Sequence, residues 1–178
     1  MKLALKLIAG LGALVVAVVS WNYVSVGYPV ASHLAEDPRN NKVSLWTYHQ
    51  YGLIPSVLVV DLRRVEDQAA AADVLRVLFQ SAEGLKDAKF ERVVLAYKGS
   101  AKLMMEGAYF RQIGQEFEFQ NPIYLMRTLP ENIYKLDGSP AYGTWTGGLL
   151  GVVGKQMEDL GEFSKDWYLR DLALDARR

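Results

Sequence analysis

The chain of 178 residues carries no net charge at neutral pH, has no cysteine and is 51% hydrophobic. This composition excludes disorder as a description of the whole chain. The missing cysteines exclude disulfides, thiolate metal sites, thiol nucleophiles and lipid attachment through a cysteine. Lysine and arginine never form a cluster longer than a pair, whereas a nucleic-acid binder needs a basic surface that displaces counterions. We therefore expect no nucleic-acid partner.

The N-terminal segment is expected to take the chain to or across a membrane. Lys2 and Lys6 precede a run without charged side chains that extends over residues 7–32. Its apolar part at 7–19 has the length found in a secretory signal, and small residues suited to cleavage follow it. Residues 3–24 are also long enough to cross about 30 Å of hydrocarbon if Lys6 reaches the headgroups. We favour the uncleaved anchor over the signal.

Both interpretations predict the same topology, because the basic residues lie before the apolar run and the next one is Arg39. The basic end of such a segment stays in the cytoplasm. We therefore expect the rest of the chain outside the cytoplasm. It would be held on the membrane by the anchor or, after signal cleavage, be secreted or periplasmic.

The stretch that follows, residues 28–42, is predicted as a linker because it contains prolines and asparagines and lacks apolar periodicity. His33, Glu36 and Asp37 lie in it. Such a group can bind a metal ion, but no second cluster accompanies it, so we interpret these side chains as solvated. The chain is thus divided into an anchor or signal at 1–27, a linker at 28–42 and a single domain at 43–178.

The domain begins with two predicted strands and a helix. Residues 43–51 are aromatic and β-branched, and residues 56–62 form a continuous apolar run typical of a strand in the middle of a sheet. The stretch 66–80 is rich in Ala and Leu and repeats apolar residues at spacings of three and four. It predicts the clearest helix of the domain, with Gly84 as a stop signal.

A hairpin and three helices complete the prediction. Residues 90–97 and 101–106 flank a short turn and predict two paired strands. This order predicts an α+β fold, in which a two-layer domain follows the N-terminal hydrophobic helix and packs helices on one face of a small mixed or antiparallel sheet. The expected helices are 109–117, a short one from Asn121–Pro122 that ends before Pro130, and 147–169.

A glycine-rich string from Thr146 to Gln156 matches a phosphate-binding loop only in part. The first glycine of the P-loop pattern would fall on Leu149, and Gln156 replaces the hydroxyl residue that would hold magnesium. Both departures remove contacts that the pattern needs. We therefore expect no nucleotide and no other cofactor.

The same string contains Gly147, Gly148, Gly151 and Gly154, which would leave a strip without side chains along the predicted last helix. Small residues let another backbone come close, whereas each interior glycine costs up to about 1 kcal/mol of helix propensity against alanine. We expect close packing inside the domain to offset that cost. A partner helix or the membrane surface is the alternative neighbour.

Catalytic side chains are sparse. His33 and His49 are the two imidazoles of the chain, and neither a Gly-x-Ser-x-Gly nor a Ser-x-x-Lys pattern occurs. His49 is expected to lie half-buried beside aromatic residues. Asp61 and Glu106 each end a predicted strand and are weak candidates for the paired carboxylates of a hydrolase. Alternatively, Asp61 forms an exposed ion pair with Arg63.

Aromatic side chains near the end of the chain complete the candidate residues, because tyrosine and tryptophan are enriched at binding surfaces. We predict a non-catalytic cell-envelope module that binds a protein or envelope partner, without metal or cofactor. The alternative is an envelope hydrolase that acts on sugar or lipid through paired carboxylates. The candidate binding residues are Tyr142, Trp145, Gly147, Gly148 and Gly151.

Overall fold

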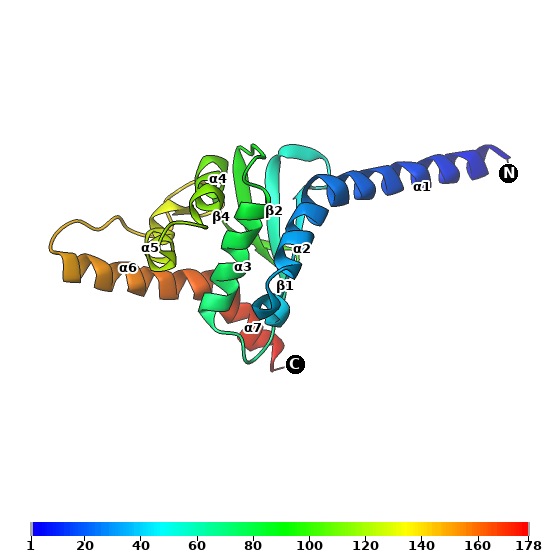
Figure 1. Ribbon diagram of the computed structural model, residues 1–178. Coiled ribbons are helices and arrows are strands. Elements are labelled where there is room, and N and C mark those ends of the chain that lie inside the picture. Colours follow the sequence, from blue (N-terminus) through cyan, green and yellow to red (C-terminus); the bar gives the residue numbers. More distant parts are fainter. Residues whose placement is uncertain (1, 178) are drawn as a thin grey trace.

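The computed structural model describes residues 2–177 and shows a long helix attached to a body of one sheet and its packed helices (Figure 1). Met1 and Arg178, with which the predicted anchor begins and the predicted domain ends, lie outside the described residues. The expected α+β class is confirmed, and the sheet is mixed.

The N-terminal helix consists of α1 (Lys2–Asn22), a π-helical turn η1 (Tyr23–Gly27) and α2 (Tyr28–Ala35). Residues 6–17 are exposed on every side of α1, which projects away from the body in Figure 1. The stretch Lys6–Ala35 is long and apolar enough to cross a membrane, and a window of 18 residues within it has a mean hydropathy of 1.9. A helix that is apolar on all sides needs an apolar environment, and the body provides none for residues 6–17.

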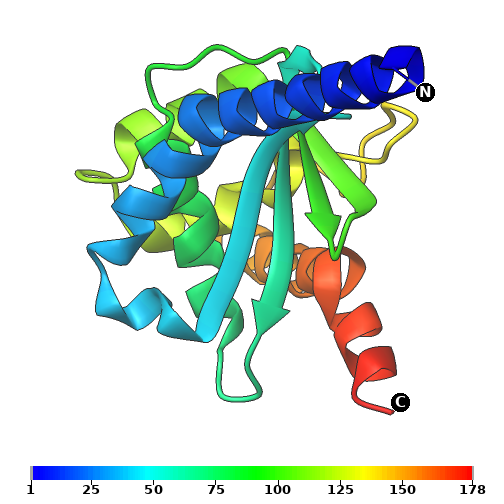
Figure 2. The same ribbon diagram turned by 90° about the vertical axis from the view of Figure 1, so that its right-hand side faces the viewer.

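Five strands form the sheet in the order β1-β2-β3-β4-β5 (Figure 2). β2 and β3 run parallel, and the three other neighbouring pairs run antiparallel. β3 and β4 form the predicted hairpin. β5 was not predicted, because two residues are too short for a sequence pattern. The strands are β1 (Val43–Gln50), β2 (Ile54–Val65), β3 (Arg92–Tyr97), β4 (Ser100–Glu106) and β5 (Ile133–Tyr134).

The clearest predicted helix is α3 (Ala71–Gly84), which begins five residues later than expected. The Asp73 carboxylate accepts a hydrogen bond of 2.9 Å from the Ala70 N–H and satisfies a donor that the helix itself leaves unpaired. The helix ends at Gly84, as predicted. A Cβ on Gly84 would lie 3.2 Å from the Pro29 carbonyl oxygen of α2, so the glycine lets the two helices approach closely.

The main core lies between the sheet and the helices, with side chains from α3, α4 and the second half of α6. Leu58, Val60 and Leu62 of β2 belong to it, whereas Val57 and Val59 belong to a smaller cluster, as expected for side chains that alternate across a strand. The remaining helices are α4 (Gly107–Glu116), α5 (Pro122–Thr128), η3 (Pro130–Asn132), α6 (Leu149–Ser164), η4 (Lys165–Leu169) and α7 (Arg170–Asp175).

The prediction of a linker at 28–42 is wrong. α2 is followed by a 3-10 turn, η2 (Pro38–Lys42), and both contact α3. Val30 is 1% exposed and belongs to the main core. The segment was missed because its prolines indicate a break in a helix, whereas Pro29 lies in the first turn of α2.

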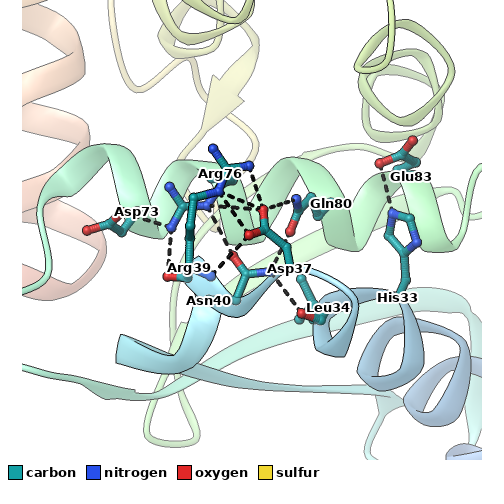
Figure 3. A network of polar contacts seen from close by, with 9 residues as sticks. All are labelled: His33, Leu34, Asp37, Arg39, Asn40, Asp73, Arg76, Gln80 and Glu83. Atoms are coloured by element: carbon teal, nitrogen blue, oxygen red, sulfur yellow. Dashed lines mark hydrogen bonds and ion pairs between the residues drawn. The ribbon is translucent and has the colours of Figure 1, made fainter.

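A polar network joins η2 to α3 (Figure 3). Asn40 is buried and donates to the Gln80 side-chain oxygen at 2.5 Å, and the Gln80 amide donates to Asp37 at 3.0 Å. Arg76 donates to Asn40 at 3.1 Å. Side-chain hydrogen bonds from Arg39 and then Gln80 hold the pKa of Asp37 well below its usual range. These side chains are therefore held in place rather than solvated.

A separate contact joins α2 to α3: His33 Nε2 lies 2.8 Å from the Glu83 carboxylate (Figure 3). Glu36 lies 3.6 Å from the other imidazole nitrogen and is exposed. Residues 28–42 are thus fixed to the body by polar side-chain contacts as well as by Val30.

Candidate functional site

The N-terminal helix joins the body along the outer edge of β1. Asn22 donates to the Gly52 carbonyl oxygen at 2.9 Å and accepts from the His49 N–H at 2.8 Å. Thr47 Oγ1 donates to the Val26 carbonyl oxygen at 2.7 Å. An edge strand otherwise presents unpaired backbone groups, so these contacts protect the edge and set the position of the helix against it.

His49 lies at this junction beside the aromatic residues Trp21 and Phe90, as predicted, but it is buried rather than half-buried. Its ring stacks on Trp21 at 4.5 Å between centroids, and its Nε2 lies 3.1 Å from Ser25 Oγ. Burial lowers the pKa of His49, and the Pro55 backbone opposes part of that shift. A serine–histidine site needs a carboxylate on the second ring nitrogen, and Nδ1 has no hydrogen-bond partner in the part of the chain described.

The candidate carboxylates Asp61 and Glu106 do not form a pair. Asp61 is level with Ala96 of β3, whereas Glu106 is level with Arg92. Those two positions are four residues apart, which corresponds to about 13 Å along a strand. Hydrolysis by two facing carboxylates would need both on one substrate, so these two residues do not supply that site.

Asp61 is part of the structural framework. It is 1% exposed and accepts hydrogen bonds from the Gly99 N–H (2.9 Å), Tyr48 Oη (3.2 Å) and Arg63 Nη1 (2.8 Å). The ion pair with Arg63 exists, but its carboxylate is buried rather than exposed. Burial, followed by the charge of Asp61, raises the pKa of Tyr48 to about 12.

Glu106 lies at an open groove of about 470 Å³, and Glu91 and Arg92 are the other charged residues that line it. Both glutamates and the arginine are exposed to solvent. The groove therefore lacks the water-excluding enclosure that a catalytic site uses to strengthen its electrostatic interactions.

The loop before α6, which contains Tyr142 and Trp145, and the first half of α6 (Leu149–Ser164) extend away from the sheet in Figure 1. We call this part of the chain the arm. Tyr142 holds its base: its hydroxyl donates to Asp166 at 2.9 Å, and burial followed by this bond raises the pKa of Tyr142. Further out, Trp145 Nε1 donates to Asp159 at 2.6 Å, and Lys155 Nζ lies 5.5 Å from the Trp145 ring centroid. The loop is therefore pinned to the helix by its two aromatic residues.

The glycines of the arm do not pack against the body, which corrects the expectation of close packing inside the domain. A Cβ on Gly151 or Gly154 would meet no atom of the described chain within 4 Å. Gly148 precedes the helix, and Gly147 has a φ of 133° that suits glycine. Leu150 beside them is 88% exposed. The strip is open because the arm extends beyond the body.

The glycines that do pack closely were missed from the sequence. A Cβ on Gly107 would overlap the Phe90 carbonyl, and a Cβ on Gly114 would overlap the Ala82 carbonyl. Both belong to α4. Their spacing of seven residues places them on one helix face, which is the signal that could have revealed them.

Within the described range 2–177, no group of three or more histidine, aspartate or glutamate side chains is arranged to hold a metal ion. No family model matches the chain, and neither a curated protein nor a solved structure matches it.

Proposed function

We propose that this chain is a membrane-anchored, non-catalytic module that holds a protein partner at the membrane, with its body outside the cytoplasm. The observation that carries the proposal is the arm. It leaves Leu150, Met157 and the backbone at Gly151 uncovered by the described chain, while the loop with Trp145 stiffens it. A preorganised surface with exposed apolar side chains and open glycine backbone suits a partner helix that approaches closely.

The exposed apolar side chains of α1 need an apolar environment, which supports the proposal that this helix anchors the chain in a membrane. The helix continues without a break past the small residues at which a signal would be cut, and it enters the main core through Val26 and Val30. That continuity favours an anchor that remains part of the folded protein. Lys2 and Lys6 before the apolar run favour a cytoplasmic N-terminus.

Photocrosslinking in the native membrane tests the partner. With a benzophenone amino acid in place of Leu150, we expect one discrete adduct with a second protein. Leu174 of α7, 56% exposed, is the matched control and should give none. Gly151→Leu in the same chain should abolish the adduct, because it fills the strip without disturbing the body. Equal labelling at both leucines, or an adduct that survives Gly151→Leu, would refute the arm as the binding surface.

A topology reporter tests the orientation separately. A reporter enzyme that is active only outside the cytoplasm, fused after the C-terminus, should be active. Activity of a cytoplasm-only reporter at the same site would show that the proposed orientation is wrong.

A further inference from the structure

The turn between β1 and β2 is held against the end of the anchor helix. Gly52 accepts the Asn22 hydrogen bond, and a Cβ on Gly52 would lie 3.2 Å from Val18 Cγ1. In Figure 1 this turn, drawn in cyan, lies beside the end of α1 at the body. Its distance from the membrane is therefore set by the helix and not by a flexible connection.

Helix geometry gives the level of the turn. Asn22 follows Lys6 by sixteen residues, which is about 24 Å of helix. The hydrocarbon layer is about 30 Å thick. If Lys6 lies at the inner headgroups, then Val18 and Asn22 are no further out than the outer boundary of the hydrocarbon. The turn that contacts both residues lies at the same level.

The composition of the turn suits that level. Tyr51 is 81% exposed, Leu53 is 65% exposed, and residues 43–60 contain no aspartate, glutamate, lysine or arginine. Trp21 and Tyr23 are exposed on the adjacent helix. Aromatic residues of this kind gather where hydrocarbon meets headgroups.

Backbone groups of the turn are also hydrogen-bonded within the protein. This suits an apolar medium, where each backbone N–H or C=O without a hydrogen bond is costly. The Gly52 N–H donates to the His49 carbonyl at 2.7 Å, and the Leu53 N–H donates to the Gln50 carbonyl at 3.2 Å. The Gly52 carbonyl is satisfied by Asn22. By contrast, the β3–β4 turn carries Lys98, which forms an ion pair with Asp175.

We propose that the β1–β2 turn, residues 51–53, inserts into the outer interface of the bilayer that α1 spans. This second contact fixes the tilt of the body and thereby the direction in which the arm points. The inference rests on the proposed anchor and adds a lipid-binding surface to it.

The test uses the full chain in vesicles of phosphatidylcholine and phosphatidylglycerol. Because the chain has no cysteine, Leu53→Cys provides a unique site for an environment-sensitive fluorophore. The matched control is Ser100→Cys, exposed at the start of β4 directly after the β3–β4 turn. We expect nitroxide-labelled lipids to quench the label at 53 several-fold more than the label at 100, and aqueous iodide to show the reverse order.

Tyr51→Asp in the Leu53→Cys chain should move the label into water. Tyr51 has a φ of 55°, which aspartate tolerates better than most residues, so the turn should keep its shape. Equal quenching at 53 and 100 would overturn the insertion, as would a label at 53 that Tyr51→Asp leaves unchanged. Resistance to alkaline carbonate extraction reports on the anchor separately: a chain that resists extraction but keeps its turn in water refutes the insertion alone.

Discussion

Helices α4 and α6 both carry glycines beside apolar side chains, but α4 lies inside the body whereas the first half of α6 extends beyond it. In α4, a Cβ on Gly114 would overlap the backbone of α3. In α6, the space around Gly151 and Gly154 is open within the described chain. Glycine spacing therefore identifies a narrow helix face, but a neighbour must be present before that face is a packed contact.

The largest expected effect is that of Gly114→Ala. The added methyl group meets the Ala82 carbonyl and the Glu83 nitrogen, and because these are backbone atoms the contact is not relieved by a rotamer change. We expect the free energy of unfolding to fall by about 3 kcal/mol or the protein to fail to fold. Urea unfolding of the full chain in detergent measures it, with Gly154→Ala as control. A loss below about 1 kcal/mol would remove the contrast between the two helices.

Leucines along α6 sharpen the contrast within one helix. Leu160 is 8% exposed and belongs to the main core, whereas Leu150 is 88% exposed. Leu160→Ala should lower the free energy of unfolding by about 2 kcal/mol, and Leu150→Ala should change it by less than about 0.5 kcal/mol. The same urea titration measures both. Similar losses for the two variants would show that the arm packs on the body.

Low pH should lower the free energy of unfolding through the buried junction at His49 and not through the arm. Burial lowers the pKa of His49, so below about pH 6.5 the unfolded chain binds a proton that the folded chain does not. Stability is therefore complete above that pH and falls as the pH decreases, by at most about 1.4 kcal/mol at pH 5.5. The pH dependence of unfolding should be smaller in His49→Gln than in the native chain. An unchanged dependence would mean that His49 is not buried as described.

The smallest expected effect has the opposite sign. Gly151→Ala should raise the free energy of unfolding by about 0.5–1 kcal/mol, because alanine loses less entropy in an open helix and meets no atom of the described chain. Thermal unfolding of the protein in detergent measures the change. Destabilisation would restore the original expectation of a packed strip.

Local signals in the sequence were sufficient for most of the elements. Asn121 accepts a hydrogen bond of 2.9 Å from the Ile123 N–H at the start of α5, as the Asn-Pro pair predicts. The hairpin and the central strand appear where apolar runs and a glycine turn indicate them. Signals that act within a few residues of one another survive in any tertiary context, which is why these predictions were confirmed.

The predictions that failed depended on which segments meet. The sequence by itself determined the apolar helix, the α+β class and the absence of cysteine chemistry, because these follow from composition and periodicity. Only the tertiary structure decided that Asp61 and Glu106 lie apart, that α2 docks on α3, and that Gly114 rather than Gly151 is packed. Such contacts join residues distant in the chain, and a single sequence carries no record of the distance between them.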